Sequence, residues 1–534
     1  MLATPRYRAG TRLGQIVELP DGQFFTLTAE GKPPFQETLG GAAFDDPWTP
    51  ERLVMRRGRG IPVVWSEPEV VHTMPGSAGL WTLGRALVDR NGDLHGIGMR
   101  FLKWPKDIER PGRDEMRCDV FHVASRDGGT TWEPPHRVDY GHEYTGALLG
   151  FTQLSSGRLL LPLHFYDFDR EAGKNVAKSC YSDDGGRTWH ADSTELPVPS
   201  GGRHSHSGAV EPTAAELGDG RVWMVIRTQF RRLYESFSSD GRTWSPPQRT
   251  RFRAPNSPCS VARLADGRLM LVWNNTQGPP FGGETRQVHA SRHVMNAAIS
   301  DDDGATWQGY REFARQIDRD NVDDQVSYPI INPLSDGRVL VQFAHVIAGW
   351  RRVETDYVVF DPDVLTETTD ADDFTHGLRG WSTNGCGGVG VAHEDGEAML
   401  RLRRVDERPT AAERNFPFGP KGELRFEIRR AADALGVDLV LDEAFWRPND
   451  RRTDAAVDAS LGIVELPAGI WTPVTVAWDI GRGEVIVSAN GSERRLPIQG
   501  DAPGLCYLTL YGRASGPELA GTDVRRLTVE VTPE

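Results

Sequence analysis

The stretch from Ala214 to Ile226, AAELGDGRVWMVI, decides how this chain is organised. An apolar segment runs into Gly218-Asp219-Gly220, and a second apolar segment follows. Asp-Gly or Asn-Gly between two such segments favours a β-hairpin, because the tight turn needs positive φ angles. Related phrases recur along the chain. Their turn glycines are Gly22, Gly92, Gly157, Gly220, Gly267 and Gly337.

The spacing of these glycines predicts a repeat architecture. They lie 47 to 70 residues apart. Six hairpins at this period indicate six units of about four strands, which fits the blades of a β-propeller with long loops. A length of 534 residues would otherwise suggest three or four domains. The 58 glycines and 36 prolines agree with a chain of many turns.

A second motif, Ser-x-Asp-x-Gly-x-Thr-Trp, alternates with the hairpins. It occupies residues 125–132, 182–189 and 300–307, and a form one residue shorter occupies 238–244. Ser and Asp side chains bond nearby backbone, glycine permits positive φ, and tryptophan buries a large ring. The motif therefore predicts a turn. Around Asp302 the spaced ligands and distal Glu of a calcium loop are missing, so we expect no metal.

The pattern changes after about residue 362. Segments such as GELRFEIRR (422–430) and WTPVTVAWDI (471–480) read as short strands, and the Asp-containing turn motif does not recur. We predict an all-β protein with a six-bladed β-propeller at 1–362 and a concanavalin-like β-sandwich at 366–534. The second domain could bind carbohydrate or simply pack on the first.

Charge and composition exclude several classes of protein. The net charge of −14 disfavours nucleic acid and anionic membranes as partners. No apolar run reaches the roughly 18 residues of a membrane span, and the N-terminal sequence shows no signal peptide. Five scattered cysteines indicate buried thiols in a cytoplasmic protein, with secretion by another route left open. No cofactor motif is present, and we expect no cofactor.

The two motifs together resemble the Asp-box, or BNR, repeats of the sialidase superfamily. The resemblance covers roughly residues 10–360 and implies a six-bladed propeller whose Asp boxes lie on outer turns, away from the active site. It also implies an exo-acting glycoside hydrolase that removes a terminal sialic acid or a related anionic sugar.

Four residues match the family's site pattern. Glu211 precedes Pro212 and the fourth hairpin, Arg227 ends that hairpin, Arg292 precedes the last turn motif, and Tyr328 opens the sixth hairpin. By this resemblance Tyr328 is the nucleophile and Glu211 its base. Arg227 and Arg292 are then two of three arginines that bind the substrate carboxylate.

The chemistry of a sialoside agrees with these roles. Its carboxylate stands on the anomeric carbon and would repel a carboxylate nucleophile, whereas a neutral tyrosine avoids the like charge. Tyrosine ionises near pH 10, so it needs an adjacent base. The arginine side chain binds a carboxylate with a planar fork. We therefore expect a retaining mechanism.

The third arginine and the general acid fit the family pattern less well. The first arginine of the family is expected before the second hairpin, where this chain has Leu83. Arg85 would share the strand face of Leu83, because side chains alternate, and Arg100 ends the same hairpin. Both are candidates for substrate binding. For the acid we predict Asp107, in the loop before the first Asp box.

Three histidines keep other functions open. His164 ends the third hairpin, and His204 and His206 lie just upstream of Glu211. They could be structural, bind sugar, transfer protons or, with a third convergent ligand, hold a metal. A uronate-directed polysaccharide lyase or a rhamnosidase is therefore an alternative; in a lyase, histidine would remove the proton α to the carboxylate. A glycan-binding propeller without activity is the other, although it would not require the Glu211–Tyr328 pair.

Overall fold

The protein is all-β. The computed structural model describes residues 2, 4–30, 52–73, 80–103, 112–198, 207–276, 291–316, 324–347, 352–383, 387–405, 410–446, 455–460, 466–513 and 520–534. Apart from strands, these residues contain two 3-10 helices, η1 (Arg113–Glu115) and η2 (Pro362–Leu365). None of the helices found in them is long and apolar enough to cross a membrane.

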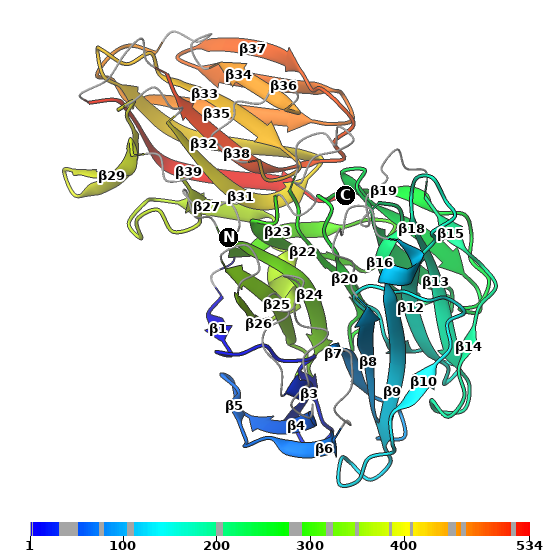
Figure 1. The fold of residues 1–534 in the computed structure, drawn as a ribbon. Coiled ribbons are helices and arrows are strands. Elements are labelled where there is room, and N and C mark those ends of the chain that lie inside the picture. The colour runs from blue at the N-terminus through cyan, green and yellow to red at the C-terminus, as the bar shows by residue number, and fades with distance from the viewer. Residues whose placement is uncertain are drawn as a thin grey trace.

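The chain up to Phe360 forms six antiparallel sheets, coloured from blue to yellow-green in Figure 1. The first contains β2 (Val17–Glu18), β3 (Phe24–Glu30), β4 (Arg52–Arg59), β5 (Val64–Trp65) and β6 (Glu69–Thr73). The second contains β7 (Leu80–Val88), β8 (Leu94–Lys103), β9 (Arg117–Ser125) and β10 (His136–Val138). The third contains β11 (Thr152–Gln153), β12 (Leu159–Tyr166), β13 (Asn175–Ser182), β14 (His190–Ala191) and β15 (Leu196–Pro197).

The remaining three sheets follow the same plan. The fourth contains β16 (Val210–Glu216), β17 (Val222–Arg227), β18 (Arg232–Ser238) and β19 (Gln248–Arg253). The fifth contains β20 (Ser260–Arg263), β21 (Leu269–Trp273), β22 (Val294–Ser300) and β23 (Gln308–Arg315). The sixth contains β24 (Gln325–Pro333), β25 (Val339–Ile347), β26 (Arg352–Phe360) and β1 (Arg6–Arg8).

Each sheet starts with one of the predicted hairpins. The six turn glycines have φ between 76° and 92°, a region that side chains with a Cβ avoid. The first strands of the last three sheets contact their neighbours: β16 lies against β20 and against β12, the second strand of the third sheet, and β20 lies against β24. The residues that enter these first strands are therefore brought together from several sheets.

The start of the chain completes the sixth sheet. Strand β1 pairs with β26, with Tyr7 opposite Tyr357. The residues that follow β1 stay attached to the sixth sheet, because Leu13 N donates to Thr355 Oγ1 (2.9 Å) and Ile16 N donates to Gln342 Oε1 (2.6 Å). The segment between β1 and β2 thus connects the sixth sheet to the first.

The four Ser-x-Asp-x-Gly-x-Thr-Trp motifs form turns between the third and fourth strands of their sheets. In the first copy, Asp127 Oδ1 accepts from Ser125 Oγ (2.8 Å) and Thr131 N (2.8 Å), and Asp127 Oδ2 accepts from Thr131 Oγ1 (2.6 Å). The hydrogen bonds from Thr131 lower the pKa of Asp127 to about 2. The second and last copies repeat the pattern. The predicted turn role is confirmed.

After Thr369 the chain forms two larger sheets. The eight-stranded sheet contains β27 (Thr369–Asp372), β29 (Val389–Glu394), β30 (Glu397–Leu402), β32 (Lys421–Arg430), β35 (Thr472–Asp479), β36 (Glu484–Ala489), β37 (Ser492–Pro497) and β39 (Thr522–Thr532). The five-stranded sheet contains β28 (Trp381–Ser382), β31 (Ala411–Gly419), β33 (Val437–Asp442), β34 (Val457–Ser460) and β38 (Leu505–Gly512).

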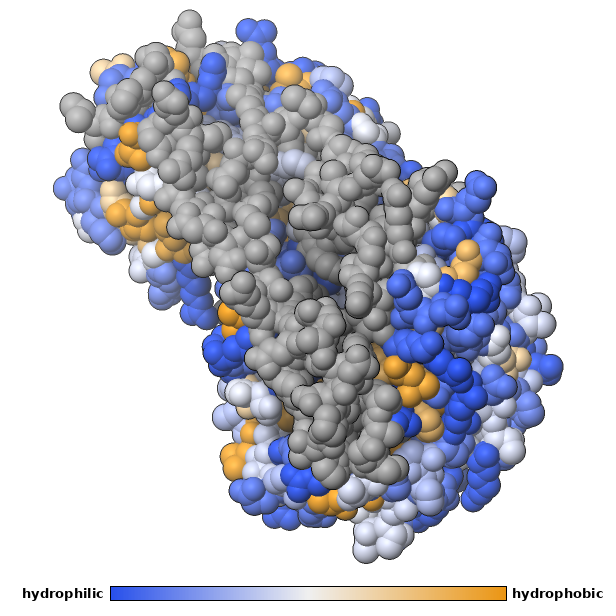
Figure 2. Space-filling model, viewed as in Figure 1, coloured by the Kyte–Doolittle hydropathy of each residue, from blue (hydrophilic) through white to orange (hydrophobic). Residues whose placement is uncertain are grey.

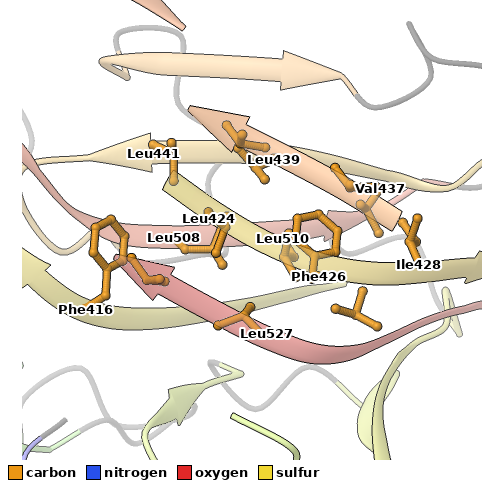
Figure 3. Packing of buried hydrophobic residues seen from close by; sticks show 14 of the residues in the cluster. Phe416, Leu424, Phe426, Ile428, Val437, Leu439, Leu441, Leu508, Leu510 and Leu527 are labelled. Carbon is orange, nitrogen blue, oxygen red and sulfur yellow. The ribbon is translucent and has the colours of Figure 1, made fainter. Parts of the chain in front are cut away.

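These two sheets share one apolar core. Leu424 and Phe426 of β32 belong to the same buried cluster as Leu439 of β33 and Leu508 of β38 (Figure 3). Inward apolar and outward polar residues alternate along β35, as expected for strands with one buried face. Burial of these side chains supplies the main favourable free energy of this part.

The five-stranded sheet also packs against the fourth and fifth of the smaller sheets (Figure 1). Phe418 stacks on Tyr310 with ring centroids 4.0 Å apart. Asn296 Nδ2 donates to Tyr507 Oη (3.0 Å), and Glu443 bridges Arg232 and Arg253. The two parts are therefore joined by an interface with both apolar stacking and buried polar pairs.

The surface and the cysteines behave as the composition predicts. The described atoms in Figure 2 are mostly hydrophilic, with apolar residues in small separate groups. Four of the five cysteines lie in described segments, and all four are buried and free of disulfides. The fifth, Cys386, lies outside the described residues.

Candidate active site

Glu211 and Tyr328 occupy the same position in two different sheets. Each precedes a proline and lies nine residues before its turn glycine. Each also has positive φ, 47° for Glu211 and 55° for Tyr328, at a break in the register of its first strand. Proline cannot donate to the ladder, and a bulge re-aims the side chain beside it. Two bulky residues in this costly conformation mark a functional site.

The two side chains meet. Tyr328 Oη donates to Glu211 Oε1 at 3.2 Å, across 117 residues of sequence. Arg227 Nη1 donates to Glu211 Oε2 at 2.5 Å. This second contact is local, because Arg227 pairs with Val210 across the fourth hairpin. Glu211 therefore lies between a phenol and a buried guanidinium.

Asn256 holds Arg227 and Arg292 next to each other. Its Oδ1 accepts from Arg227 Nε, and its backbone carbonyl accepts from Arg292 Nη2, both at 2.6 Å. The backbone of Arg292 is fixed to β24 because its carbonyl accepts from Val326 N (2.9 Å). The Arg292 guanidinium lies 5.6 Å from the centre of the Tyr328 ring. Both arginines are fully buried.

A third arginine, which was not among the predicted site residues, belongs to this group. Arg12 lies in the segment between β1 and β2, and its guanidinium interacts electrostatically with the Tyr328 phenol. Desolvation by surrounding protein lowers its pKa, although its side chain is exposed. Its guanidinium is thus partly surrounded by protein atoms and remains accessible to solvent. The sequence does contain a pattern that points to Arg12. Arg12 lies ten residues before the turn glycine Gly22, and Glu211 and Tyr328 each lie nine residues before their own turn glycines.

The charges around Tyr328 act in opposite directions on its ionisation. Desolvation raises the pKa of the phenol, and the Glu211 carboxylate raises it further, while Arg227 and Arg292 lower it. The phenol is therefore protonated at neutral pH and ready to give its proton to Glu211. The two arginines would stabilise negative charge that develops on its oxygen.

Part of the arginine hydrogen-bonding capacity is unused. Arg227 Nη2 and both Nε and Nη1 of Arg292 are buried and form no well-aligned hydrogen bond. The pKa of Arg292 falls to about 10, first because of desolvation and second because of Arg227. Buried guanidinium groups that repel each other next to an accessible arginine form a site for an anionic ligand.

His164 supports Glu211 from behind. The side chain is buried at the end of β12, and its Nδ1 accepts from Glu211 N at 3.0 Å. Desolvation lowers its pKa to about 4, so the ring is neutral near pH 7. Its position fixes the backbone of Glu211 in the bulge.

The other two predicted arginines lie elsewhere. An extra residue, Gly84, interrupts the register between Leu83 and Arg85, so the assumed alternation between those two positions does not hold. Arg85 is buried and does not join the group around Tyr328, and Arg100 lies on β8, the second strand of its sheet. The third arginine beside Tyr328 is Arg12, which precedes the first hairpin and not the second.

Three predicted residues, Asp107, His204 and His206, lie outside the described residues. Elsewhere two groups have a spacing that could hold a metal. In one of them, Asp356 already pairs with Arg6 and Arg8 (2.6 and 3.4 Å). The other is formed by Asp89, Asp93 and His95 in the second hairpin. Within the part of the chain that the structure describes, neither group includes His164.

Comparison with known proteins agrees with the motifs. Residues 99–341 match the BNR repeat-like domain. The chain is 26% identical over 358 residues to a sialidase of Micromonospora viridifaciens, covering 61% of this chain and 48% of the relative. It is 30% identical over 226 residues to a sialidase of Vibrio cholerae, covering 38% and 27%. The chain is thus related to the sialidase superfamily, as its motifs predicted.

These likenesses are partial. The chain spans about half, or less, of the length of these two relatives. Among solved structures it resembles Trypanosoma rangeli sialidase with a TM-score of 0.47 and 12% identity, over 99% of this chain and 96% of that one.

Proposed function

We propose that the six small sheets are the blades of a closed β-propeller and that the two larger sheets form a β-sandwich, with the boundary near residues 362–366. The pairing of β1 with β26 supports closure, since it ties the first sheet to the sixth. The apolar core shared by the two larger sheets supports the sandwich. In this arrangement the first strands surround a common axis, and Arg12, Glu211 and Tyr328 meet at one end of it.

We propose that the protein is an exo-acting retaining glycosidase that removes sialic acid or a related sugar with a carboxylate on its anomeric carbon. The observation that carries this proposal is the convergence of Arg12, Arg227 and Arg292 on a tyrosine hydrogen-bonded to Glu211. Three cations suit one substrate carboxylate, and the tyrosine–glutamate pair suits a nucleophile with its base.

The reaction has two displacements. In the first, Tyr328 Oη attacks the anomeric carbon and transfers its proton to Glu211, while the bond to the leaving oxygen breaks. That oxygen takes a proton from a general acid, for which Asp107 is the sequence-based candidate. In the second, water attacks the anomeric carbon and gives a proton to the general acid, which lost its own proton in the first step. The bond to Tyr328 breaks, and Glu211 returns a proton to the phenolate. Configuration is retained because each displacement inverts it.

The alternatives receive less support from the described residues. A lyase needs a histidine free to remove a proton, whereas Nδ1 of His164 already accepts from the Glu211 amide and the ring is buried. A binding protein would need the arginines but not two strained residues that join a phenol to a carboxylate. A rhamnosidase acts on a neutral sugar, which would leave the arginine group without an anionic partner.

The test is turnover of an aryl sialoside by the wild type and Tyr328→Phe. We expect the variant to lose at least about 10³-fold in kcat because it has no nucleophilic oxygen. A 2,3-difluorinated sialic acid should lose its anomeric fluoride and transfer the remaining 3-fluorosialosyl group to a peptide containing Tyr328, in the wild type alone. Turnover of the variant within a few-fold of the wild type would refute the mechanism.

The matched control is Tyr310→Phe. Tyr310 is a buried tyrosine at the contact with the C-terminal sheets, and it too has positive φ (51°). It takes no part in the group around Tyr328, so its variant should turn over substrate normally. Formation of an unsaturated product absorbing in the ultraviolet would instead identify a lyase.

A further inference from the structure

Arg85 is a buried cation without a counter-charge. It is 3% exposed, and its Nε, Nη1 and Nη2 form no hydrogen bond in the structure. Arginine stays protonated in proteins, and a buried charge is expensive unless it is paired. Two other buried arginines of this chain are paired with carboxylates: Arg227 with Glu211, and Arg232 with Asp501 at 2.9 Å. An unpaired guanidinium therefore indicates a missing partner.

The position of Arg85 places it in the interior of the six-sheet part. It lies seven residues before its turn glycine, whereas Glu211 and Tyr328 lie nine residues before theirs. Two residues along a strand amount to roughly 7 Å, so Arg85 is deeper in its sheet than the candidate site. The bulge at Gly84 sets its direction. A side chain could not replace that glycine, because its Cβ would come within 2.9 Å of Leu148 Cβ.

The neighbour that Arg85 reaches is Cys259, at the start of the fifth sheet. Cys259 lies eight residues before its own turn glycine, at nearly the same depth. Its thiol is fully buried and its pKa is raised by desolvation, so it is neutral and cannot balance the arginine. A neutral S–H is a weak donor, which adds a second group suited to an acceptor.

Carboxylates are absent from this place among the residues that the structure describes. Burial lowers the pKa of Arg85 to about 9, and the interaction that opposes this shift comes from the Cys259 thiol and not from a carboxylate. Glu211 acts on Cys259 but not detectably on Arg85. The place therefore offers three nitrogen donors of one guanidinium and a neutral thiol, with no carboxylate to balance the charge. A small anion fits these groups.

We propose that Arg85 binds a small monovalent anion, chloride in solution, inside the six-sheet part and below the group around Tyr328. The anion neutralises a buried charge that would otherwise destabilise the fold. This site is separate from the substrate site and does not depend on the proposed activity.

The test uses the full-length protein with halide as the probe. Wild-type crystals grown without chloride are soaked in sodium bromide, and anomalous data are collected at the bromine edge. We expect a bromide peak within hydrogen-bonding distance of the Arg85 guanidinium. An ordered water at that place and no anomalous peak would overturn the proposal.

A second measurement is independent of crystals. Thermal unfolding is followed as chloride replaces gluconate at constant ionic strength. We expect the wild-type Tm to rise saturably by about 1–3 °C, because the ligand binds the folded state alone. Arg85→Met should abolish this response. Arg232→Met, which removes a buried arginine with its own carboxylate, should keep it. An equal response in wild type and Arg85→Met would contradict the site; if Arg85→Met does not fold, the bromide crystals decide.

Discussion

The Asp-containing turns and the group around Tyr328 are built on the same six sheets, yet they satisfy their charges in opposite ways. In the turn of Asp127, both carboxylate oxygens accept hydrogen bonds from residues within four positions of sequence. Around Tyr328, Arg227 and Arg292 keep buried nitrogens without well-aligned partners. The residues come from the fourth and sixth sheets, from the segment between β1 and β2 and from the segment before β22.

This contrast separates structure from function. A repeated, self-satisfied turn stabilises the fold wherever it occurs, because its bonds do not need a ligand. A convergent group with unused donors lowers the stability of the free protein. Binding of an anion stabilises it, because the donors then form charge-assisted hydrogen bonds. The positive φ angles of Glu211 and Tyr328 add to that cost. Substitutions in the two regions should therefore affect different properties.

The largest difference is expected between Glu211→Gln and Asp302→Asn. Glu211→Gln removes the base and leaves Arg227 unpaired, so kcat on an aryl sialoside should fall by about 10²–10⁴-fold. Asp302→Asn changes a carboxylate in a turn and should leave kcat within about two-fold, since the turn lies away from Tyr328. Equal losses in both variants would remove the distinction between the regions.

The next largest effect concerns arginines. Arg12→Ala should lower kcat/KM by about 10²-fold, since truncating one partner of a charge-assisted contact costs about 2–5 kcal/mol. Unfolding should change little, because the Arg12 side chain is exposed.

Arg126→Ala is the control for Arg12. Arg126 pairs with Asp93 and Glu133 beside the first turn motif, at 2.7 and 3.1 Å. Its loss should not change kcat/KM. A normal kcat/KM in Arg12→Ala would remove Arg12 from the substrate site.

His164 in the site and Asp127 in the first turn should also change their protonation at different pH values. The pKa of His164 is about 4 in the folded protein and near 6.5 when unfolded, so the unfolded state binds the proton first as pH falls. The stability contributed by the neutral ring is present above pH 6.5 and is lost between pH 6.5 and 4, by about 3 kcal/mol in total. In the turns, Asp127 keeps its charge down to about pH 2.

Urea unfolding at pH 7 and pH 4.5 measures this difference. His164→Gln keeps an acceptor for the Glu211 amide and removes the titration, so its stability should vary less with pH than that of the wild type. The same pH dependence in both proteins would show that His164 does not titrate as expected.

The smallest effect is expected in the turns themselves. Ser300 Oγ is buried, donates to Asp302 Oδ1 and accepts from Gly304 N, both at 2.8 Å. Ser300→Ala should destabilise the protein by about 1–2 kcal/mol and leave kcat unchanged. A loss of activity without a loss of stability would assign the turn a role in function.

The features that the sequence predicted are local ones. A turn glycine needs positive φ whatever surrounds it, so Gly220 and the five related glycines could be recognised one by one. The turn around Asp127 forms its hydrogen bonds within seven residues. The meeting of Glu211 with Arg227 was also within reach, because one hairpin brings them together.

The features that it missed depend on long-range contacts or on a single inserted residue. The proximity of Arg12 to Tyr328 follows from the pairing of β1 with β26, and no local pattern encodes that pairing. The register break at Gly84 changed the assignment of Arg85, and a bulge of this kind is invisible to simple alternation. The role of His164 as an acceptor for a backbone amide depends on the bulge at Glu211.

The pairing of β1 with β26 determines when the protein can become active during its synthesis on the ribosome. Some 350 residues separate Arg6 from its partner Val358. At synthesis rates of about 5–20 residues per second, β1 waits roughly 20–70 s for a partner. Until then Arg12 is not held next to Tyr328, which is itself synthesised only shortly before β26. We therefore expect catalytic competence to arise late during translation, after β26 has emerged, and an incomplete nascent chain to be inactive however well its first sheets have folded.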